Sequence, residues 1–506
     1  MLSYKAKNKR MFRSSKGLSH FLPAIVFVAS CLFLTLLLST IKPAVFFSGD
    51  GGLKYLATQQ VNRQGSPVVL ELRAEDWVNN IRNKGYYPFK PPFVYEQQDR
   101  KIISFPPYFQ WLSAPLLRYF GTIGLYIIPA VSVVLLWLWF MQVLYRLKIK
   151  VWVISAALFS LVFCTPLTLY GAIYWEHTLA VLLLFGGLAF LVNPDETRTR
   201  AFVTGCLTGF AAWLRPEALL LWLLMVALVL YNQTRQHRKT NLYFVTGSFV
   251  IGALFFLNNW LLYKNLLGAH GYQLTQETLP RARLTQSLFL LRYLNTTQLL
   301  FFPLEAVVYA MALYTVARKY PLPKPVAQLI LLSVLFSVTA PFFLPNGGGK
   351  QWGPRYLLVL VPIILLAGTL LFQHLAIRDN PLWLLVPCML YSIYLNCFSG
   401  YQTLRNDYAH RVKPCLELLL QDSCKTIVVQ NQFVALEFAA LFSSKNIFLA
   451  EDAFSYARLQ ALLLGAGQQQ WIFVAQDRQL VLPCQPQHRT DAVRHAGDYF
   501  FVRCHR

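Results

Sequence analysis

The stretch FLPAIVFVASCLFLTLLLSTI, residues 21–41, is apolar over about 20 residues and decides the class of the protein. A helix of this length crosses the hydrocarbon core of a bilayer. The preceding residues 1–20 contain no acid and carry the basic side chains Lys5, Lys7, Lys9, Arg10, Arg13 and Lys16. A cleaved signal peptide would have a shorter apolar core and a small-residue cleavage site. We therefore predict an uncleaved first helix with residues 1–20 in the cytoplasm.

The composition of the whole chain agrees with a membrane protein. Of 506 residues, 56% are hydrophobic and 13% are charged, and the mean hydropathy is +0.43. A soluble domain carries about 25% charged residues. Aromatic residues make up 15% of the chain, and such residues gather at membrane interfaces. These values exclude a soluble enzyme, intrinsic disorder, collagen and coiled coil.

Further apolar segments predict an α-helical polytopic protein with about 11 transmembrane helices. They lie near 122–145, 151–170, 177–193, 201–214, 217–231, 241–262, 299–317, 326–345, 356–373 and 381–398. Basic residues cluster in alternate loops, as expected on the cytoplasmic side. The weakest assignment is 201–231, where Arg215-Pro216 favours two short helices over one. An odd number of spans places the C-terminal tail outside, together with a long first loop over 42–121.

The charge balance points to membrane lipids as partners. There are 46 Lys and Arg residues against 22 Asp and Glu, a net charge of +24. The basic residues are spread between apolar segments, so anionic lipid is a better partner than nucleic acid. The 9 cysteines include no CxxC pair, which argues against a thiolate metal site.

Residues 399–506 have a soluble composition and predict a small extracytoplasmic α/β domain. We expect strands at 426–429, 446–449, 471–474 and 499–502, with helices at 433–442 and 453–464. The domain holds Cys415, Cys424, Cys484 and Cys504. Pairing of Cys415 with Cys424 and of Cys484 with Cys504 is one of three connectivities, and four free thiols are the alternative. The membrane module spans 21–398.

Four acids near predicted membrane boundaries are candidate functional residues: Asp50, Glu176, Glu217 and Glu305. Ionisable groups at membrane depth are costly and are retained for function or in pairs. Asp50 opens the first outside loop, where its alternative role is a turn-forming Asp in a Gly-rich segment. Glu305 could instead satisfy a helix gap near Pro303. His177, next to Glu176, could be an ordinary buried histidine.

Three basic residues on the predicted outer side of the membrane, where the four acids also lie, could bind a phosphate: Arg215, Lys350 and Arg355. Gly347-Gly348-Gly349 precedes Lys350, and glycine N–H groups can approach an anion closely. We expect Arg355 at the start of a helix, where the dipole is positive. Arg215 could instead pair with Glu217, and Arg355 could be an interfacial snorkelling residue.

The order of these motifs resembles the GT-C membrane glycosyltransferases, especially the aminoarabinose-transferase and protein O-mannosyltransferase branch. The resemblance covers about residues 20–398. It is carried by Ser48-Gly-Asp50 with Tyr55 after the first helix, Tyr174-Trp-Glu176-His177, Leu214-Arg-Pro-Glu217, and Gly-Gly-Gly-Lys350-Gln-Trp-Gly-Pro-Arg355-Tyr356. The C-terminal domain resembles no definite family.

The resemblance implies an inverting transferase that moves a sugar from a polyprenyl phosphate donor to a lipid, glycan or protein acceptor at the outer face. It implies Asp50 as general base or acceptor-orienting residue and Glu176 as a second catalytic acid. We assign substrate binding to Arg215, Glu217, Lys350, Arg355, Tyr356, His177 and Tyr55. No DxD motif or second Asp lies near Asp50, so we expect no cofactor and no metal.

A transporter or flippase for a lipid-linked or anionic substrate is the main alternative, and a non-catalytic assembly subunit is a third. Transporters commonly show internal repeats and broken helices at the midplane, whereas these charges gather at one predicted face. We expect a bacterial inner membrane, although the sequon Asn295-Thr-Thr297 would be usable in a eukaryote.

Overall fold

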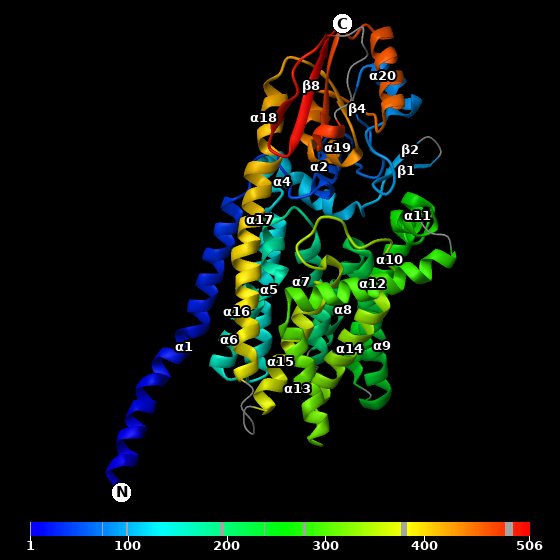
Figure 1. The fold of residues 1–506 in the computed structure, drawn as a ribbon. Coiled ribbons are helices and arrows are strands. Elements are labelled where there is room, and N and C mark those ends of the chain that lie inside the picture. The colour runs from blue at the N-terminus through cyan, green and yellow to red at the C-terminus, as the bar shows by residue number, and fades with distance from the viewer. Residues whose placement is uncertain are drawn as a thin grey trace. The chain divides into compact units, whose positions relative to one another are not determined.

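The computed structural model describes residues 2–505 except 73, 98–99, 193–196, 237, 277–279, 376–381 and 481–488. The chain forms two compact units (Figure 1). Unit 1 comprises Met1–Ser39, Ile128–Leu266 and Thr278–Tyr401. Unit 2 comprises Thr40–Ile127, Leu267–Glu277 and Gln402–Arg506. The first loop and the C-terminal region therefore belong to the same unit.

The secondary-structure elements of unit 1 in its described residues are all helices. Its elements are α1 (Leu2–Ser39), α5 (Ile127–Arg146), α6 (Val151–Phe163), η2 (Pro166–Ala172), α7 (His177–Val192), α8 (Arg198–Leu214), α9 (Pro216–Gln236), α10 (Lys239–Tyr263), α12 (Pro280–Phe301), α13 (Leu304–Ala317), α14 (Lys324–Thr339), η3 (Ala340–Phe342), η4 (Arg355–Leu357), α15 (Leu360–Leu375), α16 (Leu382–Ile393) and η5 (Tyr394–Ser399). The two short helices predicted within 201–231 are confirmed as α8 and α9.

The apolar helices of unit 1 make the chain a multi-pass membrane protein. Within the described residues, five helices are long and apolar enough to span a bilayer, and two bent helix pairs raise the number to seven. The bends are 58° between α6 and η2 and 97° between α12 and α13. The total of about 11 spans stays a prediction.

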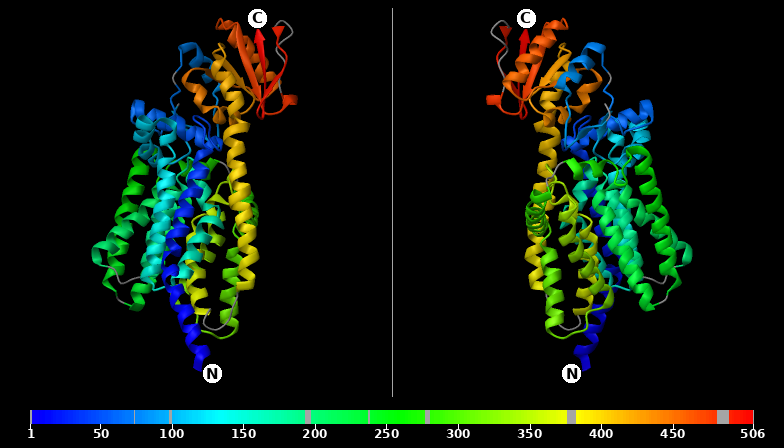
Figure 2. Two further views of the ribbon diagram at one scale, coloured as in Figure 1. Left: turned by 90° about the vertical axis from the view of Figure 1, so that its left-hand side faces the viewer. Right: turned by 90° about the vertical axis from the view of Figure 1, so that its right-hand side faces the viewer.

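Small residues allow the helices of unit 1 to approach closely. A Cβ atom on Gly205 of α8 would lie 2.0 Å from the carbonyl oxygen of Phe244 on α10, and one on Gly247 would lie 2.2 Å from that of Phe202. Such close backbone contacts are typical of helix pairs in membranes. The long helices of unit 1 run side by side (Figure 2). Helix α7 is buried all round and contacts α8, α9 and α15. The N-terminus of α7 is thus held at the centre of the unit.

Unit 2 combines helices with a six-stranded sheet. Its elements before α5 are α2 (Gly49–Gln64), α3 (Asp76–Ile81), η1 (Arg82–Tyr86), β1 (Val94–Gln97), β2 (Arg100–Ile103) and α4 (Tyr108–Gly124). It also contains α11 (Ala269–Gln276) and, after the start of α17 (Gly400–Asn406), η6 (Asp407–Arg411), α18 (Lys413–Gln421), β3 (Thr426–Val429), α19 (Gln432–Glu437), η7 (Ala439–Ser443), β4 (Asn446–Leu449), α20 (Ala453–Gly465), β5 (Gln470–Ala475), η8 (Arg478–Leu480), β6 (Arg489–Thr490), β7 (Arg494–Ala496) and β8 (Tyr499–His505).

The sheet has the strand order β4-β3-β5-β8-β6, with β7 paired to β8. Strands β3, β4 and β5 are parallel, and β8 runs antiparallel to β5. The runs Thr426–Val429 and Asn446–Leu449 are buried and β-branched or aromatic, which favours strands in a covered sheet. All four predicted strands and the predicted helix at 453–464 are confirmed, whereas the single helix predicted at 433–442 is divided at Phe438 into α19 and the 3-10 helix η7.

The first loop and the sheet share one hydrophobic core. Val78 and Ile81 of α3 lie in the same buried cluster as Phe448 of β4 and Trp471 of β5. Tyr456 of α20 joins the cluster and accepts a hydrogen bond from Trp471 Nε1 at 3.0 Å. The segment before α4 therefore covers one face of a sheet that is formed by the end of the chain.

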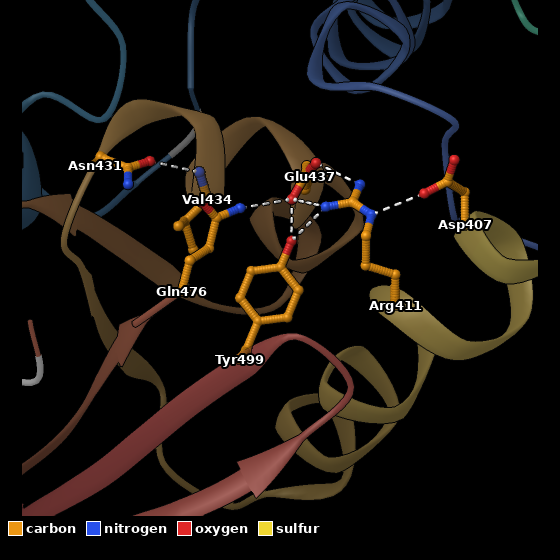
Figure 3. Close-up of polar contacts among 7 residues, drawn as sticks. All are labelled: Asp407, Arg411, Asn431, Val434, Glu437, Gln476 and Tyr499. Carbon is orange, nitrogen blue, oxygen red and sulfur yellow. Dashed lines mark hydrogen bonds and ion pairs between the residues drawn. The ribbon is translucent and has the colours of Figure 1, made fainter. Parts of the chain in front are cut away.

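A buried ion-pair network joins η6 to the sheet (Figure 3). Arg411 Nη1 donates to Glu437 Oε2 at 2.9 Å, and Arg411 Nε donates to Asp407 at 3.0 Å. The Tyr499 hydroxyl donates to Glu437 as well. Burial alone would lower the pKa of Arg411, but the hydrogen bonds and charge of Glu437 raise it above the ordinary value. The network thus keeps a buried cation fully compensated.

The predicted pairing of Cys415 with Cys424 is wrong, because both thiols are free. Cys415 is buried on α18. The Cys424 thiol instead donates to the carbonyl oxygens of Thr426 at 3.4 Å and Gln470 at 3.6 Å, at the start of the sheet. Cys504 is disulfide-bonded, and Cys484 lies outside the described residues.

Helix α2, which carries Asp50, packs closely against α19 because glycines lie at the contact. A Cβ atom on Gly52 would lie 1.9 Å from the carbonyl oxygen of Leu436, and one on Gly49 would lie 2.9 Å from Leu436 Cβ. Only a residue without a side chain allows this contact. The glycines that follow and precede Asp50 therefore fix the position of its helix in unit 2.

We expect Gly52→Ala to destabilise unit 2 by about 1–3 kcal/mol, because the added methyl group overpacks the contact with Leu436. Gly465→Ala is the matched control, since no atom lies within 4 Å of its Cβ position. The thermal midpoint of the purified protein in detergent, followed by size-exclusion chromatography, reports the difference. An unchanged midpoint in Gly52→Ala would contradict the contact.

Candidate functional site

An aromatic layer precedes α7 in unit 1. The ring centroids of Tyr170, Trp175 and His177 lie 5.1–5.5 Å apart. The Tyr170 hydroxyl donates to the carbonyl oxygen of Trp352 at 3.0 Å. All three rings are buried. The layer fixes Glu176, which lies between Trp175 and His177, at the N-terminus of α7.

Arg215 stands at the break between α8 and α9. Pro216 is the first residue of α9, a position that proline favours. A residue before proline prefers extended backbone, and Arg215 has φ −142° and ψ 130°. This conformation ends α8 where the Arg215 side chain meets Glu217 on α9 and Glu176 just before α7.

Two carboxylates hold the Arg215 guanidinium. Its Nη1 donates to Glu176 Oε1 at 2.9 Å, and its Nε donates to Glu217 Oε1 at 2.7 Å. The side chains of Arg215, Glu176 and Glu217 are exposed by only 8%, 2% and 3%. The predicted alternative of a local Arg215–Glu217 pair is confirmed, and Glu176 is a second partner that lies 39 residues away. Loss of one partner of such a buried pair costs about 3–5 kcal/mol.

Arg355 and Tyr356 complete the group. The Arg355 guanidinium carbon lies 5.2 Å from the Trp175 ring centroid and 5.3 Å from that of Tyr356. The Arg215 guanidinium carbon lies 5.5 Å from the Tyr356 ring. Tyr356 therefore contacts both cations through its ring, and such contacts strengthen when they are desolvated. We call Glu176, Arg215, Glu217, Arg355 and Tyr356 the Arg215 cluster.

Arg355 begins a helix, as expected, but the helix is short. Arg355–Leu357 form the short 3-10 helix η4, and α15 begins at Leu360. The residue before Arg355 is Pro354 with φ −81° and ψ 88°, which is not helical. Arg355 is thus positioned by its aromatic neighbours and not by the terminus of α15.

The glycine-rich loop before Arg355 is shaped by positive φ angles. Gly348 has φ +105°, and a Cβ atom there would lie 3.2 Å from Arg355 Nε. The Gly348 N–H donates to Asn346 Oδ1 at 3.0 Å, so one of the donors expected to meet an anion already has a partner. The Tyr356 hydroxyl contacts the same Asn346 oxygen at 3.4 Å. Lys350 is exposed in this loop.

The charges of the Arg215 cluster balance. Two carboxylates, Glu176 and Glu217, face two guanidinium groups, Arg215 and Arg355. Both carboxylates form ion pairs with Arg215. Glu217 Oε2 is buried and has no hydrogen-bond partner within the described part of the chain. Glu217 Oε2 can therefore accept one further hydrogen bond.

Asp50 and Tyr55 belong to unit 2. Asp50 lies in the first turn of α2, where a carboxylate is favoured by the helix dipole. Tyr55 is buried and accepts a hydrogen bond from Gln59 Nε2 at 2.6 Å, and burial raises the pKa of its hydroxyl. Its ring lies 5.1 Å from that of Phe46.

Lys54 is a residue that the sequence reasoning missed. It is 1% exposed, and its Nζ lies 4.7 Å from the centroid of the Phe105 ring. Lys54 follows Asp50 by four residues on α2, so both side chains lie on the same helix face. The Asp-x-x-x-Lys spacing after the first helix was the signal that could have identified it.

Glu305 is buried near the bend between α12 and α13. It lies in the first turn of α13 after Pro303, and its Oε2 has no hydrogen-bond partner in the described ranges. An apolar cavity of about 150 Å³ lies among residues of α6, α13, α15 and α16, including the neighbouring Leu304 and Val308. This cavity offers an apolar surface inside unit 1.

Comparison with known proteins identifies the fold. No protein-family model matches the chain, and no curated protein matches it. Two solved structures of ArnT from Cupriavidus metallidurans are similar to it, each with 13% sequence identity. The structure bound to undecaprenyl phosphate has a TM-score of 0.56 over 95% of this chain and 97% of that one. The apo structure has a TM-score of 0.57 over 97% and 98%.

ArnT is an aminoarabinose transferase with a GT-C fold. The likeness extends over nearly the whole of both chains, including the C-terminal residues that resembled no family in sequence. The chain described above therefore has the ArnT-like GT-C fold that its motifs predicted.

Proposed function

We propose that this protein is an inverting glycosyltransferase that moves a sugar from a polyprenyl phosphate carrier to a lipid, glycan or protein acceptor. The observation that carries the proposal is the likeness to ArnT along the whole chain, because one of the ArnT structures is bound to undecaprenyl phosphate. The buried Arg215 cluster adds guanidinium groups and carboxylates that can bind the charged and polar groups of a sugar-phosphate donor. A transporter would share the membrane unit, but no feature described above favours it over a transferase.

Asp50 is the proposed general base. An acceptor hydroxyl must lose its proton as it attacks the anomeric carbon of the donor, and a carboxylate within hydrogen-bond reach can accept that proton. Asp50 lies in a helix whose position is fixed by Gly49 and Gly52 against Leu436. Lys54, one turn further, is a buried cation on the same helix face.

Arg355 is the proposed ligand of the donor phosphate. The departing phosphate needs positive charge and hydrogen-bond donors. Arg215 is held by Glu176 and Glu217, and the Arg355 guanidinium lies against the rings of Trp175 and Tyr356, next to the glycine-rich loop at Gly348. We therefore assign the phosphate contact to Arg355, and to Lys350 at the exposed loop, and give Arg215 a positioning role.

The two carboxylates of the Arg215 cluster take different roles in this proposal. Glu176 orients Arg215 through its 2.9 Å contact. Glu217 keeps one buried oxygen without a partner in the described residues, which suits a donor group of the substrate. His177 packs against Trp175 and supports the aromatic layer. Tyr55 supports the helix of Asp50.

The isoprenoid chain needs apolar surface in the membrane. We propose that it uses the 150 Å³ cavity among α6, α13, α15 and α16 of unit 1. Helix α4 of unit 2 is amphipathic and offers apolar surface of its own. Tyr119, Phe120 and Ile123 of α4 are exposed by 61–76%. An amphipathic helix with such exposed residues lies in the membrane interface.

We propose a bacterial inner membrane location with the N-terminus in the cytoplasm and unit 2 outside. Basic residues before the first span support this orientation. The disulfide of Cys504 also supports it, because disulfides persist in oxidising compartments.

Asp50→Asn should lower transfer by about 10²–10⁴-fold, because it removes the base without changing the size of the side chain. Envelope glycolipids and glycans of a strain lacking the protein are compared by mass spectrometry after complementation with wild type or variant. The exposed Asp477→Asn is the control and should restore the missing sugar mass. Full restoration by Asp50→Asn would remove the general base from the proposal.

Arg355→Gln should weaken binding of undecaprenyl phosphate by about 10–100-fold, since a charge-assisted hydrogen bond contributes about 1.5–3 kcal/mol. Titration of the purified protein with radiolabelled undecaprenyl phosphate measures the dissociation constant. Lys350→Gln serves as the comparison and should have a smaller effect because Lys350 is exposed. An equal affinity of wild type and Arg355→Gln would contradict the phosphate contact.

Transfer should persist after removal of divalent cations with EDTA, because the proposal neutralises the phosphate with Arg355. No group of three His, Cys, Asp or Glu side chains in the described ranges is arranged to hold a metal ion. The rate of sugar transfer by purified protein with and without EDTA tests this. A loss that added Mg²⁺ or Mn²⁺ restores would show a metal-dependent mechanism.

A further inference from the structure

Arg82, at the start of η1 in unit 2, is a buried cation that the proposed reaction does not use. Its side chain is 4% exposed. Its Nη2 donates weakly to the carbonyl oxygen of Ile447 at 3.4 Å. Its Nε and Nη1 have no hydrogen-bond partner in the part of the chain that the structure describes. The guanidinium also lies 5.9 Å from the Phe448 ring.

The charge of Arg82 is uncompensated. No carboxylate of the described residues forms an ion pair with it, in contrast to Arg411 and Arg215. Burial lowers the pKa of Arg82 to about 10, because the low dielectric disfavours the charged form. A buried charge is costly unless an anion or hydrogen-bond acceptors surround it. The arrangement is therefore incomplete in the chain alone.

Arg82 borders a cavity of about 890 Å³ whose walls carry an excess of positive charge. The cavity residues include five basic side chains and two acids: Arg82, Arg100, Lys101, Lys425 and Lys445, against Glu71 and Glu75. Lys101 is paired with Glu96 at 2.7 Å. Lys445 is buried, and its Nζ donates to backbone carbonyl oxygens, among them that of Cys424 at 2.9 Å. Its charge is therefore also without a carboxylate within the described chain.

A second cavity, of about 520 Å³, lies on another side of Arg82 and has balanced charges. Its basic residues are Arg82, Lys90 and Lys101, and its acids are Glu96, Glu451 and Asp452. Lys90 is paired with Glu451 and Lys101 with Glu96. An anion is thus favoured in the larger cavity and not in this one.

The remaining walls of the larger cavity suit a saccharide. Tyr87 and Phe442 provide aromatic surface, and Asn79, Asn83 and Ser444 provide amide and hydroxyl groups. Amides and hydroxyls exchange hydrogen bonds with sugar hydroxyls. A volume of about 890 Å³ falls in the range of cavities that hold whole small molecules and exceeds what a bare phosphate ion fills.

From these contacts we infer that the 890 Å³ cavity of unit 2 is a binding site for a phosphate-bearing saccharide, with Arg82 and Lys445 as its buried cations. The inference is independent of the transfer reaction, because all of its residues belong to unit 2 and none has a role proposed in catalysis. The phosphate would supply the counter-charge that Arg82 lacks. The same headgroup chemistry occurs on soluble sugar phosphates and on glycolipids.

Binding of glucose 1-phosphate to the full-length protein, purified in an uncharged polyoxyethylene detergent, tests the site. Isothermal titration and the thermal midpoint are both measured, with glucose and inorganic phosphate as comparison ligands. We expect glucose 1-phosphate to bind at least tenfold more tightly than either, because the cavity offers cations and sugar-binding groups together. Equal binding of glucose would contradict recognition of charge, and equal binding of inorganic phosphate would contradict recognition of the sugar.

Arg82→Gln distinguishes a ligand site from a structural arginine. Removal of an uncompensated buried cation should raise the thermal midpoint of the unliganded protein and weaken glucose 1-phosphate binding at least tenfold. Arg82→Lys should retain part of the binding because it retains the charge. Arg458→Gln, an exposed change on α20 outside the cavity, should alter neither quantity. A lower midpoint in Arg82→Gln with unchanged binding would overturn the inference.

The decyl ester of glucose 1-phosphate separates the two sources of the headgroup. We expect it to bind as tightly as glucose 1-phosphate, because the cavity walls recognise the headgroup. Binding of the decyl ester without binding of glucose 1-phosphate would place recognition in the alkyl chain and overturn the inference. Because these measurements need no transfer, they stand apart from the Asp50→Asn experiment.

Discussion

A guanidinium buried among apolar helices must be matched by carboxylates, and this requirement organises unit 1 at Arg215. The residue ends α8, its partner Glu217 begins α9, and its partner Glu176 precedes α7. Three helices are thereby joined at one point by charges that cannot separate without a large loss of free energy. The aromatic layer and Arg355 are built on this junction, since Trp175 is the neighbour of Glu176 and Tyr356 lies against both arginines.

Unit 2 contains one buried guanidinium that is matched by carboxylates, that of Arg411, and one that is not, that of Arg82. Arg411 is compensated by Asp407 and Glu437, with Tyr499 completing the network. Arg82 is equally hidden from solvent but faces aromatic and carbonyl groups instead of carboxylates. Arg82 contacts β4, whereas Arg411 contacts Glu437 of α19 and Tyr499 of β8. The difference is local to the residues that surround each guanidinium.

Local patterns predicted local structure well. The β-branched and aromatic runs at Thr426–Val429 and Asn446–Leu449 became strands, and Arg215-Pro216 separated α8 from α9, because these features depend on neighbouring residues. Contacts between distant residues were not predictable in this way. Glu176 pairs with Arg215, 39 residues away, and Val78 packs with Trp471. The sequence around Glu176 or Val78 does not indicate these distant partners. The Cys415–Cys424 pairing failed because proximity in sequence was taken for proximity in space. The helix that begins at Arg355 is only the short η4, because α15 begins at Leu360.

The contact of Gly52 with Leu436 and the common core of Val78 with Trp471 have a consequence for biosynthesis. The ribosome makes the helix of Asp50 about 380 residues before its seat on α19 exists. At elongation rates of about 5–20 residues per second, that interval is about 20–80 s. During it, the apolar face of α3 has no sheet to cover, and chaperones or the membrane surface must shield it. Unit 2 therefore completes its folding only after the last strand has been synthesised, when every helix of unit 1 has already emerged.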